Sequence, residues 1–223
     1  MAQERRDLEA HPLWRGEGVP EGRGRRVVLV PGFLAGPRSL SLLEPWLQRC
    51  GWDTRRAPVG RNTQPGEAVL DLLEDWLQET VALEGGPVPV IGHSRGGQEA
   101  RVLAVRHPDA VALLVTLGAP LRVLYPPHVV VRAPAAALQL AAWARRSRPD
   151  LSGHERYEAD RVAPFPASVP FVSVYSHSDG FIDWRLSLDP AAEHVEIDST
   201  HLGLAGSVPA FEAIARALRR RDG

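Results

Sequence analysis

Apolar runs alternate along this chain with segments in which apolar residues recur every three or four positions. The apolar runs predict buried strands, which lie at 27–31, 88–92, 111–117, 171–175 and 195–197, with a weaker candidate at 52–57. The three-to-four-residue recurrence predicts helices, which lie near 40–47, over 67–81, at 98–106 and at 209–221. Strands that alternate with helices favour an α/β fold, in which helices cover both faces of a mostly parallel sheet.

Two stretches interrupt this alternation. Residues 1–26 are polar and glycine-rich, which predicts a flexible leader that runs over the surface, with Leu13 and Trp14 as its anchors. Residues 121–167 separate two strands by more chain than a crossover helix needs, and 133–146 within them are apolar nearly all round. A helix of that kind must be covered on several sides, so we expect this insertion to form a helical cap or lid.

Size and composition fit one globular domain that spans residues 1–223, with a hydrophobic content of 44%. The net charge of −1 gives no broad attraction to nucleic acid or to an anionic membrane. The single cysteine, Cys50, excludes an internal disulfide and suggests a buried structural thiol. Neither a signal peptide nor a membrane-spanning run is evident, so we expect a cytoplasmic protein with no integral membrane segment. No metal-binding motif is present, and we expect neither a catalytic metal nor a cofactor.

The sequence G-H-S-R-G at 92–96 connects a predicted strand to a predicted helix. A serine lifted out of the backbone at such a turn needs a strained backbone with positive φ, and glycines at 92 and 96 remove the resulting collisions. The amides at the start of the helix then face charge that develops on a substrate oxygen. The pentapeptide alone is also typical of an ordinary glycine-rich turn, but the flanking strand and helix favour Ser94 as a nucleophile.

A serine nucleophile needs a base, and the base needs a carboxylate that orients it. Asp179 comes just after the predicted strand at 171–175, and His201 lies in the loop after the strand candidate at 195–197. The carboxyl ends of parallel strands open onto one rim of a sheet, so Ser94, Asp179 and His201 are expected to meet there.

Other polar residues near these segments have alternative interpretations. Asp183 is a second candidate for the acid, although it lies further from the strand end than Asp179. His177 and His194 are expected to be structural or exposed. Asp198 is expected to be a solvated loop carboxylate, and the alternative is that it orients the histidine loop. His93, next to the nucleophile, is expected to pack in the interior.

The chain resembles the α/β-hydrolase superfamily, and within it the bacterial lipase and esterase-type serine hydrolases. The segments that carry the resemblance follow the predicted strands: V-L-V-P-G-F-L at 28–34, G-H-S-R-G-G at 92–97, L-G-A-P-L at 117–121, S-D-G-F-I-D at 178–183 and H-L-G-L at 201–204. One residue departs from the pattern, because Pro31 stands where many members carry histidine.

The resemblance implies hydrolysis of carboxylic esters by a Ser94–Asp179–His201 triad through an acyl-enzyme. It also implies an oxyanion hole made by the backbone amides of Phe33 and Arg95, and substrate contacts that we place at Leu34, Leu121 and Trp143. The expected partner is a small-molecule ester or a lipid-like substrate, and the expected state is a monomer or a small homo-oligomer. The alternatives are a thioesterase or acyltransferase with the same triad, or a non-catalytic binding homologue.

Overall fold

A single parallel sheet forms the centre of the molecule. The computed structural model describes residues 2–35, 40–122 and 151–220. Within these residues the sheet has six strands in the order β2-β1-β3-β4-β5-β6, and every neighbouring pair is parallel. The strands are β1 (Arg26–Val30), β2 (Asp53–Arg56), β3 (Val88–His93), β4 (Val111–Leu117), β5 (Phe171–Tyr175) and β6 (Glu193–Glu196). The predicted parallel α/β sheet is therefore confirmed.

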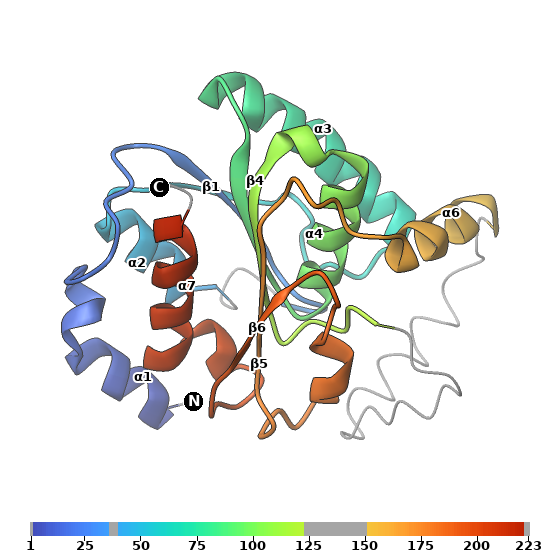
Figure 1. Cartoon of the computed structure of the whole chain (residues 1–223). Helices are drawn as coiled ribbons and strands as arrows, with labels where there is room; N and C mark the ends of the chain where they lie inside the picture. The colour runs from blue at the N-terminus through green and yellow to red at the C-terminus, as the bar shows by residue number, and fades with distance from the viewer. Residues whose placement is uncertain (1, 36–39, 123–150, 221–223) are drawn as a thin grey trace.

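Helices cover both faces of the sheet (Figure 1). One face carries α1 (Ala2–Ala10), α2 (Leu43–Arg49) and α7 (Val208–Arg220), and the other carries α3 (Gly66–Glu84), α4 (Arg95–Arg106) and α6 (Leu151–Val162). Side chains of β1 alternate between the faces, because Val27 and Leu29 join the cluster beneath α7 while Val28 and Val30 join the cluster beneath α3. Burial on both sides explains why this strand is apolar throughout.

The amino-terminal segment is folded, so the expectation of a flexible leader over residues 1–26 is wrong for the part that the structure describes. Residues 2–10 form α1, and Pro12–Arg15 form a 3-10 helix. Leu8 and Leu13 are buried in the same core cluster as α7, and the indole Nε1 of Trp46 donates a hydrogen bond to the Leu13 carbonyl at 2.8 Å. Leu13 anchors this segment as expected. Apolar spacing did not predict α1, because the residues around Leu8 in this helix are mostly charged.

Charge pairs dock α6, which the hydrophobic pattern did not predict. The Arg106 guanidinium on α4 bonds to Glu67 and Glu74 of α3 and to Asp160 of α6, at 2.7–3.1 Å. Tyr157 lies directly over Gly66, where an added Cβ would come within 2.7 Å of its ring. The expected apolar helix at 133–146, by contrast, lies outside the described residues.

The buried thiol of Cys50 matches its predicted structural role. Burial raises its pKa to about 11, so the thiol stays protonated and unreactive near neutral pH.

The loops that carry the predicted site residues Phe33, Ser94, Asp179 and His201 all follow the carboxyl ends of strands. Short 3-10 helices shape two of these loops, at Trp184–Ser187 after β5 and at Gly203–Ala205 after β6, and a third, at Pro108–Ala110, precedes β4. Because β1, β3, β4, β5 and β6 are consecutive and parallel in the sheet, the loops after them meet at one rim.

Replacement of Leu8 by alanine tests whether α1 belongs to the core. Leu8 is 0% exposed, so Leu8→Ala should lower the free energy of unfolding by about 2–5 kcal/mol, as buried leucines usually do. Leu83→Ala is the matched control, because Leu83 is 53% exposed and its loss should cost less than about 0.5 kcal/mol. Urea denaturation followed by circular dichroism measures both, and equal small losses would contradict the packed helix.

Candidate active site

Ser94 occupies a sharp turn between β3 and α4, as predicted from the glycines around it. Its backbone has φ 55° and ψ −127°, a strained conformation for a residue with a side chain. A Cβ added at Gly92 would lie 2.5 Å from the Gly97 Cα, and one added at Gly96 would lie 2.5 Å from the Pro31 carbonyl oxygen. Glycine at both positions is therefore required for α4 to begin so close to the strands.

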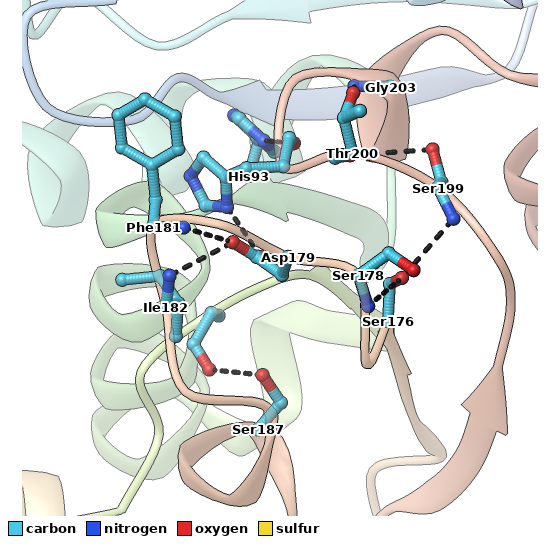
Figure 2. Close-up of polar contacts among 12 residues, drawn as sticks. His93, Ser176, Ser178, Asp179, Phe181, Ile182, Ser187, Ser199, Thr200 and Gly203 are labelled. Atoms are coloured by element: carbon cyan, nitrogen blue, oxygen red, sulfur yellow. Dashed lines mark hydrogen bonds and ion pairs between the residues drawn. The ribbon is translucent and has the colours of Figure 1, made fainter. Parts of the chain in front are cut away.

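Asp179 and His201 form a short, buried hydrogen bond. The Nδ1 of His201 lies 2.6 Å from Oδ2 of Asp179, and both side chains are buried. The second oxygen of Asp179 accepts hydrogen bonds from the backbone amides of Phe181 and Ile182, at 2.8 and 2.9 Å (Figure 2). An ionised carboxylate satisfied in this way holds the proton of His201 on Nδ1, which leaves Nε2 as an acceptor.

The alternative acid, Asp183, does not contact His201 in this way. Its side chain caps the 3-10 helix at Trp184–Ser187, where Oδ1 accepts the Arg185 amide at 3.0 Å, and it pairs with the Arg185 guanidinium. The carboxylate that the fold brings against the histidine is therefore Asp179.

The Asp179–His201 pair lies beside the Ser94 turn. Gly118 follows β4, and a Cβ there would come within 3.0 Å of Asp179 Oδ2 and 3.3 Å of His201 Nδ1. Leu117, which precedes Gly118, accepts a hydrogen bond at its carbonyl from the Ser94 amide at 2.8 Å. The end of β4 thus contacts both the serine and the pair, and the three predicted residues share one rim.

His93 links the serine turn to the histidine loop. Its ring is buried, and Nε2 lies 2.9 Å from the backbone carbonyl of His201, to which it donates as a neutral imidazole. Burial, together with the neighbouring His201, lowers the pKa of His93 to about 4. His93 is interior, as expected, but the sequence did not reveal its bond to the loop that carries His201.

A contact from α1 supports the histidine loop. Glu4 Oε1 accepts hydrogen bonds from Ser199 Oγ at 2.9 Å and from the Thr200 amide at 3.2 Å, and Ser176 Oγ accepts the Ser199 amide at 3.2 Å. Figure 2 shows Ser176, Ser199 and Thr200 on adjoining loops. Sequence reasoning missed Glu4, because nothing in a charged amino-terminal segment points to a loop at the other end of the chain.

The predicted oxyanion residues flank the serine turn. A Cβ at Gly32, the residue before Phe33, would lie 3.0 Å from the Ser94 Cβ, so this loop packs against Ser94. Arg95 is the first residue of α4, where a backbone amide has no acceptor within its own helix. Both backbone segments therefore lie next to Ser94.

The predicted substrate contacts have different surroundings. Leu34 is half-buried in the loop after β1 and has φ 54°, whereas Leu121 is buried in the cluster beneath α3 and α4. Trp143 lies outside the described residues. Two apolar residues that the sequence did not single out are exposed beside the site: Phe181, whose ring stacks 5.2 Å from that of His201, and Leu202. Each lies within a motif quoted above, at 178–183 or 201–204, which is the signal that the sequence held.

The other polar candidates near the rim are exposed. His177 and His194 are exposed, and the Asp198 carboxylate accepts a hydrogen bond from Ser178 Oγ at 2.8 Å. Across residues 2–35, 40–122 and 151–220, no group of three His, Cys, Asp or Glu side chains could hold a metal ion. In the same ranges, every helix is too short or too polar to cross a membrane.

Comparison with solved structures identifies the fold. A lipase from Bacillus licheniformis, BlEst2, superposes with a TM-score of 0.61 at 14% identity, covering 88% of this chain and 94% of the lipase. A methylesterase of Arabidopsis, MES16, gives 0.59 at 18% identity, covering 88% and 99%. A thioesterase domain from the curacin biosynthetic pathway gives 0.57 at 15% identity, covering 90% and 93%.

These similarities show that the chain has the α/β-hydrolase fold, as the resemblance of its motifs implied. No protein-family model and no curated protein matches the sequence.

Two buried groups in this region should give opposite pH dependences of stability. His93 has a pKa near 4 instead of 6.5, so between these values the unfolded chain binds an extra proton and stability falls as the pH falls. Glu99 on α4 is fully buried, and burial raises its pKa from 4.5 to about 7, against the opposing charge of Arg95. Between pH 4.5 and 7 the native state therefore binds the extra proton, and stability falls as the pH rises.

In the wild type the two effects oppose each other from pH 4.5 to 6.5. Relative to wild type, Glu99→Gln should make the unfolding free energy rise more steeply with pH, by about 1.4 kcal/mol per pH unit. His93→Gln should change the slope by a similar amount in the opposite direction. Urea denaturation at half-unit pH intervals measures the slopes, and curves parallel to that of the wild type would contradict the assignments.

Proposed function

We propose that this chain, which has the α/β-hydrolase fold, is a serine hydrolase of carboxylic esters that acts through an acyl-enzyme. Ser94 is the nucleophile, His201 the general base and Asp179 the acid that orients it. The observation that carries the proposal is the 2.6 Å contact between the buried side chains of Asp179 and His201, beside a serine with φ 55°. A strained serine next to a carboxylate-oriented imidazole is the arrangement that activates a hydroxyl for attack.

In the first half-reaction, Ser94 Oγ attacks the ester carbonyl carbon and His201 Nε2 takes the hydroxyl proton. The carbonyl π-bond electrons move onto the oxygen, which the backbone amides of Phe33 and Arg95 stabilise, typically by about 3 kcal/mol per donor. The tetrahedral intermediate then collapses, the bond to the leaving oxygen breaks, and His201 returns its proton to the departing alcohol. In the second half-reaction, water repeats these steps and releases the acid from Ser94.

Asp179 stabilises the imidazolium that forms on His201. Its carboxylate accepts the amides of Phe181 and Ile182 as well as the His201 Nδ1 proton, so its buried charge is compensated by three hydrogen bonds. A carboxylate fixed on both oxygens cannot rotate away from the histidine. The imidazole therefore keeps the tautomer that presents a free Nε2 to Ser94.

Apolar surface next to the site favours esters with apolar groups. Phe181 is 42% exposed and Leu202 is 46% exposed, and both adjoin the residues proposed as acid and base. Each methylene that a substrate buries on such a surface contributes about 0.8 kcal/mol. Leu34 and Trp143, with the cap proposed over 121–167, complete the proposed binding surface for a small-molecule or lipid-like ester, whereas Leu121 is 2% exposed and belongs to the core.

Replacement of the nucleophile is the direct test. Ser94→Ala should abolish both hydrolysis of p-nitrophenyl acetate and labelling by a fluorophosphonate probe, because it removes the hydroxyl that attacks both reagents. Ser178→Ala is the matched control. Ser178 is an exposed serine in the same loop as Asp179, so the Ser178→Ala variant should still be labelled like the wild type. Labelling of Ser94→Ala at the wild-type level would overturn the proposal. A panel of acyl lengths, offered as oxygen esters and as thioesters, then separates an esterase from a thioesterase.

Replacement of each candidate acid tests the role of Asp179. Asp179→Asn should lower kcat by roughly 10⁴-fold, because an amide favours the wrong tautomer of His201. Asp183→Asn should lower kcat by less than about tenfold, since Asp183 caps a 3-10 helix and pairs with Arg185. Steady-state rates on the same ester measure both, and the reverse ranking would show that Asp183 is the acid.

A further inference from the structure

The two proposed oxyanion amides belong to separate segments of the chain, so something must hold those segments together. Phe33 lies in the loop after β1, and Arg95 begins α4. Hydrogen-bond donors stabilise a developing charge only when both are aimed at one position within a few tenths of an ångström. Next to these segments lies a buried polar cluster that the mechanism does not use: Asn62, Glu99 and the side chain of Arg95.

Glu99 is the centre of this cluster. It lies one turn after Arg95 on α4 and is 0% exposed. Its Oε1 accepts a hydrogen bond from Arg95 Nε at 2.7 Å, and its Oε2 accepts one from Asn62 Nδ2 at 2.6 Å. Both carboxylate oxygens therefore have a donor, and the two donors come from different parts of the chain.

Asn62 joins α4 to the oxyanion loop. Its Nδ2 donates to Glu99 and also to the carbonyl of Pro31 at 2.9 Å, two residues before Phe33. Its backbone has φ 51°, a left-handed conformation that asparagine tolerates better than most residues. One side-chain amide thus contacts both the helix that begins at Arg95 and the loop that leads to Phe33.

The Arg95 side chain bonds to the backbone of the same segment that carries Asn62. Its Nη1 donates to the Asn62 carbonyl at 3.3 Å and its Nη2 to the Gln64 carbonyl at 2.5 Å, while the guanidinium lies 5.8 Å from the centre of the Phe33 ring. The residue whose backbone is a proposed oxyanion donor is therefore anchored by its own side chain to the same cluster.

A buried ion pair of this kind is a weak source of stability, because removing both charges from water offsets much of their attraction. The raised pKa of Glu99 reflects that cost of burial. The cluster instead fixes the position of the oxyanion loop relative to α4, because Asn62 and Glu99 together bond to the Pro31 carbonyl and to the Arg95 side chain.

We propose that Asn62 and Glu99 are positioning residues for the oxyanion hole, holding the Pro31–Phe33 loop against the first turn of α4. This inference rests on the proposed serine hydrolase. Without the Asn62 amide or the Glu99 carboxylate, the Phe33 and Arg95 amides lose their fixed separation, so stabilisation of the oxyanion falls while binding of the ground-state ester changes little.

Two substitutions test the hydrogen bonds by which Asn62 and Glu99 join α4 to the oxyanion loop. Asn62→Gly keeps φ 51° accessible and removes only the side chain, whereas Glu99→Gln keeps the shape of the carboxylate. In Glu99→Gln, an amide donor takes the place of one carboxylate oxygen, so the bonds to Arg95 and Asn62 can no longer both be kept. Each should lower kcat by roughly 10–100-fold, part of the 10²–10³-fold loss seen when an oxyanion donor is removed, with KM within about twofold of wild type.

Asp189→Asn is the matched control. Asp189 forms a buried ion pair with Arg101, also on α4, at 2.6 Å. Its loss should destabilise the fold in a similar way and leave kcat per active site within about twofold, because Arg101 bonds to the end of α6 and not to the oxyanion loop.

The decisive readout is the affinity for an aryl trifluoromethyl ketone, which forms a tetrahedral oxyanion on the nucleophile. Active sites are first counted with the fluorophosphonate probe, so that unfolded protein does not enter the rates. Across wild type, Asn62→Gly and Glu99→Gln, the ketone affinity should fall by the same factor as kcat/KM.

If the wild type labels at Ser94 but kcat and ketone affinity are unchanged in both variants, the positioning role is overturned. Equal losses in Asp189→Asn would overturn it too, because a general structural defect would then account for them. A wild type that neither hydrolyses esters nor labels at Ser94 would instead overturn the proposed function, and this inference with it.

Discussion

The constraint on which the rim depends is the close approach of α4 to the end of β1, with Ser94 between them. Helix α4 can begin there only because Gly96 lies under the Pro31 carbonyl and Gly92 lies against Gly97. That approach forces the Ser94 backbone to φ 55° and lifts the residue out of the strand. It also brings the loop after β1 against the serine, so the strained turn and the proposed oxyanion loop are consequences of one contact.

Polar contacts then fix the loops that meet at this turn. The Asp179 carboxylate is held by two amides of its own loop and bonds to His201, while the His201 carbonyl accepts from buried His93. Glu4 holds the same loop from α1. Buried polar groups are costly unless they are paired, so each of these bonds restricts its loop to one arrangement. A site assembled from segments far apart in the sequence needs such restrictions, because loops alone do not keep a fixed geometry.

The sequence by itself determined the sheet, the serine turn and the order of the candidate triad. Strands β4 and β5 were predicted with the bounds that the structure shows, because fully apolar runs have no alternative to burial. Ser94, Asp179 and His201 could be placed at strand ends, because parallel strands share one rim and glycine spacing marks a sharp turn. The sequence favoured Asp179 over Asp183 because it lies nearer the end of β5, but only the fold shows that Asp179 is the carboxylate that contacts His201.

The tertiary structure alone revealed α1, α6 and the polar contacts around the site. Helices α1 and α6 are mostly polar, and they are held by Leu8, Tyr157 and charge pairs to Arg106 rather than by an apolar stripe. The contacts of Asn62 with Glu99 and of Glu4 with Ser199 join residues whose spacing follows no period. Apolar periodicity is a local property and is legible in a sequence. The partner of a buried polar side chain depends instead on how distant segments fold against each other, and only the folded chain determines it.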